Sequence, residues 1–142
     1  MDYLDQFKDK INEANKIWRE SIEIENISIL RLQIQRTFSC IPDMATLASK
    51  AEREYRLLKM EVVKRVPGDF KGDARRVWIE GETSGMRYQR DVLDTLHRGL
   101  INKISAQKSI LASLIQEMKD IGLEEWAVVF RAIVLTILDV SI

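Results

Sequence analysis

The chain has few of the residues that interrupt helices or build covalent and metal frameworks. Its 142 residues include one cysteine, one histidine, two prolines and six glycines. Because Cys40 is alone, a disulfide framework within one chain and a cysteine cluster for zinc are both excluded. The scarcity of proline and glycine, together with 46% hydrophobic and 31% charged residues, is typical of a helix-rich globular domain.

Targeting and membrane signals are also missing. The first residues lack the basic start and apolar core of a secretory signal, and their acidic side chains argue against a transit peptide. The most apolar segment, Trp126 to Leu138, has 13 residues, whereas a helix that crosses a bilayer needs about 20. We therefore expect no membrane partner and a cytoplasmic location, in a bacterium or a phage-infected cell.

A repeat of apolar residues three and four positions apart is the clearest pattern present. Its members are Leu100, Ile104, Leu111, Leu114, Met118 and Ile121, interrupted only by the polar Gln107. This spacing places the side chains on one face of a long helix that must pack against other helices. We predict this helix from about Ser84 to Ile121, with a turn at 81–85 before it and Gly122 closing it.

A second seam lies upstream. It consists of Met44, Ala48, Ala51, Tyr55, Leu58 and Val62. Pro42 and Asp43 predict the start of its helix, Pro67 and Gly68 predict its end, and a short element opens at residue 72. Leu57, Met60 and Val63 form another apolar stripe on the outer face of this helix. One partner helix cannot cover both stripes, so the outer one is a predicted oligomer interface.

The two ends of the chain are less clearly patterned. Apolar residues from Leu4 to Trp18 predict an amphipathic helix, and the isoleucine-rich stretch 22–34 is interpreted as helix with a β-hairpin left open. Within the final stretch 123–142, residues 126–138 are apolar nearly all round, which favours burial in a subunit interface and leaves a terminal strand as the alternative. The predicted interface residues of this segment are Trp126, Phe130, Ile133 and Ile137.

These elements predict an all-α fold, an elongated bundle of long antiparallel helices that forms oligomers. We interpret the chain as one domain with three parts: an N-terminal helical arm (1–41), a hairpin-like body (43–121) and an apolar C-terminal segment (122–142).

Candidate catalytic residues are isolated. His97 follows Asp94 and Asp91 at helical spacing but has no second histidine, so we interpret it as a surface or interface residue rather than a metal ligand or an acid-base group. Cys40 lies in an apolar stretch without an adjacent base and is interpreted as a core thiol. The glycines of 81–85 lack the lysine and spacing of a phosphate loop. We expect no enzyme, metal or cofactor.

Charge is the better guide to function. The net charge is zero, but residues 50–119 hold 15 basic and 10 acidic groups, a net charge of +5. The predicted nucleic-acid-binding residues are Lys50, Arg53, Arg56, Lys64, Arg65, Lys71, Arg75 and Arg76. Such residues can follow a phosphate backbone, with Phe70, Trp78 or Tyr88 stacking on bases. The alternative is a solvated surface paired with nearby glutamates.

Residues 51–118 resemble small helical recombination-mediator and single-strand-annealing accessory proteins of tailed bacteriophages. The resemblance is carried by AEREYRLLKMEVVKRV (51–66) and by DVLDTLHRGLINKISAQKSILASLIQEM (91–118). It implies a homo-oligomer that binds single-stranded DNA through Lys50 to Arg76 and helps to load a recombinase. We expect this non-enzymatic function. The alternative is a protein-binding adaptor, a phage structural component or an inhibitor of a host protein, that docks through its apolar C-terminal segment.

Overall fold

The computed structural model describes the backbone of residues 2–140 and the side chains as far as Leu138, and within that range the chain forms four helices and no strand. The helices are α1 (Tyr3–Gln6), α2 (Lys8–Arg19), α3 (Ile27–Lys64) and α4 (Gly72–Val140). The predicted all-α class is therefore confirmed. The last part of the predicted apolar segment, 141–142, lies outside the described residues.

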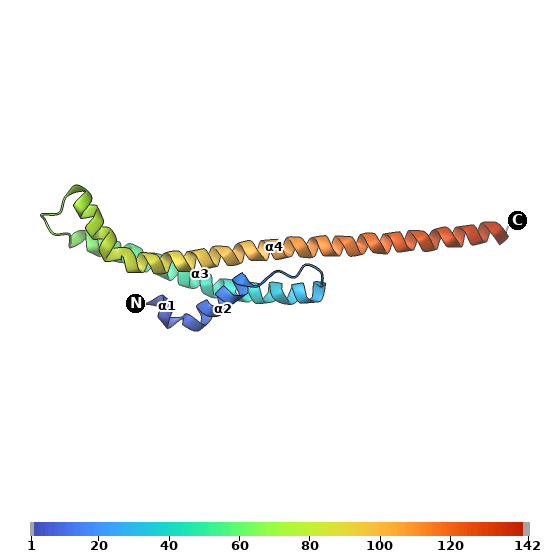
Figure 1. Cartoon of the computed structure of the whole chain (residues 1–142), viewed down its shortest axis with the longest axis horizontal. Coiled ribbons are helices and arrows are strands. Elements are labelled where there is room, and N and C mark those ends of the chain that lie inside the picture. The colour runs from blue at the N-terminus through green and yellow to red at the C-terminus, as the bar shows by residue number, and fades with distance from the viewer. Residues whose placement is uncertain (1, 141–142) are drawn as a thin grey trace.

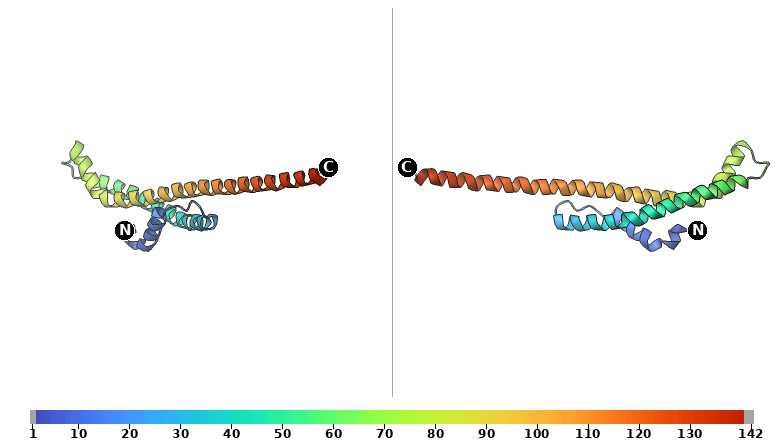
Figure 2. Two further views of the ribbon diagram at one scale, coloured as in Figure 1. Left: turned by 45° about the vertical axis from the view of Figure 1, so that its right-hand side comes forward. Right: turned by 180° about the vertical axis from the view of Figure 1, so that it is seen from behind.

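The molecule is elongated, and its helices pack together along only part of its length. α3 and the first half of α4 lie side by side, and the loop of residues 65–71 joins their adjacent ends (Figure 1). α1 and α2 lie against this pair, whereas α4 continues alone past the start of α3 (Figure 1, Figure 2). Gly72, where α4 begins, has a φ of +58°, a conformation that glycine adopts without steric cost.

The core lies where the two predicted seams meet. From the seams, the buried residues are Met44, Ala51 and Val62 of α3 and Leu100, Ile104 and Gln107 of α4. Ala14 and Ile17 of α2 also belong to the core, together with Tyr3, Leu47, Met86, Leu93 and Leu96. Burial of a large apolar side chain contributes about 1.5–3 kcal/mol, so these contacts hold the three helices together. Further along the same α4 stripe, Met118 and Ile121 are exposed, so only the first part of that seam is covered.

α3 continues through Pro42, so the predicted helix start at Pro42 and Asp43 is wrong. Proline lacks an N–H and crowds the preceding turn, which normally ends or kinks a helix. Here packing on both sides overrides that cost, since Cys40 and Ile41 pack on the core before the proline and Met44 is buried after it. A break would turn one of these groups away from the core. Figure 2 shows that α3 instead changes direction along its length.

α4 is also continuous where glycines predict breaks. The predicted turn at 81–85 and the predicted end at Gly122 are both wrong. A glycine costs only about 1 kcal/mol relative to alanine inside a helix, which is too little to end a long one. The Thr83 hydroxyl donates to the Ile79 carbonyl (2.8 Å), and such bonds within a helix tend to bend it. Figure 1 shows a bend in the green-to-yellow stretch of α4.

The predicted helix over 22–34 is correct only from Ile27 onward, and the β-hairpin alternative is wrong, because residues 20–26 form an irregular link. Asn26 begins α3 by accepting a hydrogen bond from the Ile29 N–H (3.1 Å). The N-terminal helix is interrupted at Phe7, which separates α1 from α2.

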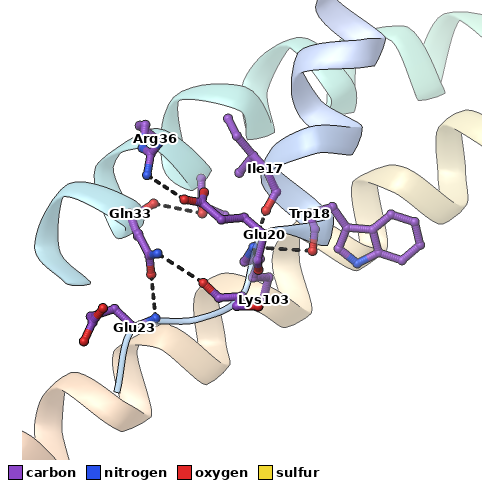
Figure 3. Close-up of polar contacts among 9 residues, drawn as sticks. Ile17, Trp18, Glu20, Glu23, Gln33, Arg36 and Lys103 are labelled. Carbon is purple, nitrogen blue, oxygen red and sulfur yellow. Dashed lines mark hydrogen bonds and ion pairs between the residues drawn. The ribbon is translucent and has the colours of Figure 1, made fainter. Parts of the chain in front are cut away.

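Polar side chains fasten the end of α2 to its neighbours (Figure 3). Lys103 of α4 is buried, and its ammonium donates to the backbone carbonyls of Ile17, Trp18 (3.4 Å) and Glu20 (2.6 Å). These are carbonyls that a helix leaves unpaired at its C-terminal end. Burial lowers the pKa of Lys103, and the Glu20 carboxylate opposes that shift. Gln33 of α3 binds the backbone of the link at two further points.

No other helix of the described residues packs against the last part of α4 (Figure 1). Every side chain from Gln116 to Leu138 is exposed. Segment 123–142 is helical as far as Val140, so the strand alternative is wrong for that part. Among the described residues, no helix is apolar over a stretch long enough to cross a membrane.

Candidate nucleic-acid interface

The eight predicted DNA-binding residues lie at and near the closed end of the α3–α4 pair. Lys50, Arg53, Arg56 and Lys64 belong to the second half of α3, Arg65 and Lys71 to the loop, and Arg75 and Arg76 to the first turns of α4. All eight side chains are exposed. They therefore extend from the second half of α3 through the loop to the start of α4, the end at which the two helices are joined (Figure 1).

Two of the eight cations are engaged in ion pairs. Arg56 binds Glu52 at 2.7 Å, and Arg76 binds Asp73 at 3.8 Å and Glu80 at 3.4 Å. The other six form no ion pair with any residue that the structure describes; they are Lys50, Arg53, Lys64, Arg65, Lys71 and Arg75. Exposed ion pairs contribute roughly 0–1 kcal/mol, so a phosphate can displace the carboxylates of the paired ones.

A basic rim surrounds part of the predicted outer stripe of α3. Met60 and Val63 form a shallow apolar surface bordered by Arg56, Lys59 and Lys64. Sequence reasoning missed Lys59, although its spacing of three and five residues from Arg56 and Lys64 was available as a signal. The predicted interface residues Met60 and Val63 and two predicted DNA-binding residues are thus immediate neighbours.

Most of the charged side chains that line the groove between α3 and α4 pair with one another. Its volume is about 860 Å³, and its walls include Arg53 and His97. Arg90 pairs with Asp91 (2.8 Å) and Glu52 (3.5 Å) and lies over the Tyr55 ring, 4.3 Å from the ring centroid. These contacts occupy Arg90, Asp91 and Glu52, whereas Arg53 in the same groove forms no ion pair with a described residue.

The residues considered as candidates for catalysis or metal binding lie apart from one another. His97 lies in the α3–α4 groove, whereas Cys40 packs half-buried against the core. Burial and the nearby Glu13 carboxylate raise the pKa of the Cys40 thiol, which keeps it protonated at neutral pH. Within residues 2–138, no three histidine, cysteine, aspartate or glutamate side chains come together as a metal site.

The candidate stacking residues divide into two groups. Phe70 and Trp78 are half-buried near the loop, whereas Tyr88 is exposed in a second groove, between α2 and α4. Trp18 lines the same groove. Sequence analysis placed Trp18 on the buried face of the first helix, but Ile17 takes the core position and Trp18 is 37% exposed.

The predicted interface residues also divide into two groups. Leu57, Met60 and Val63 are exposed near the basic end, whereas Trp126, Phe130, Ile133 and Ile137 are exposed on the far part of α4. The rings of Trp126 and Phe130 stack with centroids 5.1 Å apart.

Comparison with protein-family models, with curated proteins and with solved structures finds no match to this chain. Function is therefore inferred from the residues and their arrangement.

Proposed function

We propose that this chain is a non-enzymatic accessory of viral or bacterial DNA recombination that binds single-stranded DNA as a homo-oligomer in the cytoplasm. In this proposal α3 and α4 pack antiparallel and the basic residues from Lys50 to Arg76 hold phosphates. The apolar residues of α4 from Trp126 to Ile137 join the copies.

The six cations without ion pairs are the main support for this proposal. They are exposed on the second half of α3, the loop and the start of α4, and none of them forms an ion pair with a described residue. Binding of phosphates to such groups releases the counterions that surround nucleic acid, which is a favourable process at low salt. The separation of this basic end from the apolar end of α4 is the second support, because assembly and DNA contact then use different surfaces (Figure 1).

A salt titration with a labelled single-stranded oligonucleotide tests the proposal. Each phosphate contact lowers the slope of log K against log salt by about 0.7 for single strands, so six contacts predict a slope of about −4. Changing Lys64, Arg65, Lys71 and Arg75 to glutamine removes four contacts and should bring the slope to about −1.

The matched control removes four positive charges elsewhere, by changing Lys8, Arg31, Lys108 and Lys119 to glutamine. This variant should keep the slope of the unchanged protein. Absence of binding at low salt, or an equal loss in both variants, contradicts the proposed interface.

The protein-binding adaptor remains a second candidate, because every side chain from Gln116 to Leu138 is exposed and the stretch is rich in apolar residues. Under this alternative the far part of α4 docks on a different protein. Purification of a stoichiometric complex with another protein, free of nucleic acid, favours the adaptor; a homo-oligomer that binds the oligonucleotide favours the first proposal.

A further inference from the structure

The groove between α2 and α4 combines aromatic rings with hydrogen-bonding side chains. Its volume is about 430 Å³. The residues that matter here are Asn12, Asn15, Trp18 and Arg19 of α2 and Tyr88 and Thr95 of α4. Two helices thus contribute one aromatic ring and at least one polar side chain each to the same hollow.

Both aromatic rings are available to a ligand. Tyr88 is 64% exposed and Trp18 is 37% exposed, and neither ring stacks on another ring among the described residues. An exposed aromatic face binds any nucleobase by stacking, because every base has a π-face.

The position of Trp18 is fixed by the fold. A Cβ at Gly99 of α4 would lie 2.5 Å from the indole, so the ring approaches α4 where only glycine leaves room. Lys103 binds the carbonyls of Ile17, Trp18 and Glu20, which holds this end of α2 against α4 (Figure 3). The aromatic wall is therefore in place before a ligand arrives, which reduces the entropic cost of binding.

The polar groups of the groove are free. Asn12, Asn15, Arg19 and Thr95 form no side-chain hydrogen bond or ion pair with any described residue. Carboxamides offer both a donor and an acceptor, which matches the edges of unpaired bases. The one carboxylate of the groove, Asp91, accepts hydrogen bonds from Arg90 at 3.0 and 2.8 Å. The α3–α4 groove differs, since its charged side chains mostly bind one another.

The geometry points to the α2–α4 groove as a site for the bases of single-stranded nucleic acid. Tyr88 and Trp18 stack on bases, Asn12, Asn15 and Thr95 bind base edges, and Arg19 reaches a phosphate. This inference rests on the proposed function, which supplies the phosphate contacts. Tyr88 follows Arg76 by 12 residues, about 18 Å along α4, a span that a few nucleotides cover.

The test compares a single-stranded oligonucleotide with an abasic strand of equal length at one salt concentration. The unchanged protein should bind the strand with bases at least roughly tenfold more tightly, given the usual strength of base stacking. Tyr88→Ala should weaken binding of that strand by roughly 5- to 100-fold and leave the abasic strand unaffected. Tyr88→Phe should restore the preference, because it keeps the ring.

Phe38→Ala is the matched control, since Phe38 is an exposed aromatic residue of α3 outside both grooves. It should leave both affinities unchanged. A protein with Trp78→Phe and Trp126→Phe retains Trp18 alone, and its fluorescence should be quenched by the strand with bases but not by the abasic strand.

The outcomes separate this inference from the proposed function. Equal affinity for the two strands, unchanged in Tyr88→Ala, overturns the base site and leaves phosphate binding intact. Failure to bind either strand at low salt overturns both.

Discussion

Two parts of the same helix, α4, differ in whether their side chains are packed or exposed. Between Ile79 and Gln107, α4 packs on its neighbours, and its buried residues include the polar Thr83, Lys103 and Gln107. Between Gln116 and Leu138, every side chain is exposed. Twelve of these are large apolar side chains, 37–68% exposed. The part of α4 with the most apolar surface is thus the part against which no other described helix packs.

This contrast indicates which surface a single copy leaves unused. Twelve such side chains at roughly 100 Å² each amount to about 1,200 Å², more than the roughly 800 Å² that each partner contributes to a standard interface. Monomeric proteins rarely expose an apolar patch of this size. The packed part has its core within one chain. The far part gains a core through the proposed self-association.

The largest expected effect comes from changing the far part of α4. Replacing Trp126, Phe130 and Ile133 with glutamine should raise the dissociation constant of the oligomer by at least about 100-fold, because buried aromatic and aliphatic side chains dominate such interfaces. Light scattering coupled to size-exclusion chromatography measures the change.

The control for that experiment changes three equally exposed apolar residues elsewhere, Ile24, Leu32 and Phe38, to glutamine. Their loss should leave the oligomer intact. If both triple variants dissociate alike, or if the unchanged protein is monomeric, the contrast between the two parts of α4 does not reflect assembly.

A paired leucine experiment tests the packed part. Leu100 is 0% exposed and Leu123 is 66% exposed. Within the variant of Trp126, Phe130 and Ile133, which removes self-association, Leu100→Ala should lower the free energy of unfolding by about 2–5 kcal/mol. Leu123→Ala should change it by less than about 0.5 kcal/mol. Urea unfolding followed by circular dichroism measures both, and similar losses at the two sites would be inconsistent with the packing.

Glycine substitutions should have opposite signs in the two parts. Gly99→Ala places a methyl group 2.5 Å from the Trp18 indole and should destabilise the fold by about 1 kcal/mol, even after the gain in helix propensity. In a Trp18→Ala background the same change should stabilise by about 1 kcal/mol. Gly122→Ala meets nothing within 4 Å and should slow amide hydrogen exchange in the far part of α4.

The smallest effect concerns alkaline pH and the packed part. Tyr3 is buried and donates to Glu54 at 2.5 Å; burial and this hydrogen bond raise its pKa from 10.0 to about 12. Between these values the unfolded chain loses the phenol proton while the folded chain keeps it. Stability therefore falls as pH rises through that window. Tyr3→Phe should flatten this part of the pH dependence, and an identical profile in both proteins would contradict the assignment.

Periodicity was sufficient to predict the helical class, the upstream seam and the first part of the downstream seam, because apolar residues at helical spacing tend to be buried together. The proline and glycine signals predicted helix breaks that the structure does not have. Pro42 and Gly122 both looked like boundaries, but packing around Pro42 and the small cost of one glycine keep the helices continuous. A local signal reflects the preference of a single residue, whereas the continuity of a helix depends on the summed contributions of many residues to its stability.

The contacts that shape the α2–α4 groove could not be predicted from the sequence. Trp18 and Gly99 are 81 positions apart. A glycine inside a helix does not indicate by itself that an indole lies against it. Lys103 is buried at the end of α2, a placement that no local pattern in the sequence predicts. Such roles arise only when α2 is placed across α4.

The unbroken length of α4 makes it a spacer. Arg76 and Ile133 are 57 residues apart on this helix, about 85 Å along it at 1.5 Å per residue. In an assembly joined at the apolar ends, the basic ends lie far from the junction. Under the proposed function, a strand bound at the basic ends therefore lies outside that junction, and the length of strand covered by each copy depends on the reach of α4.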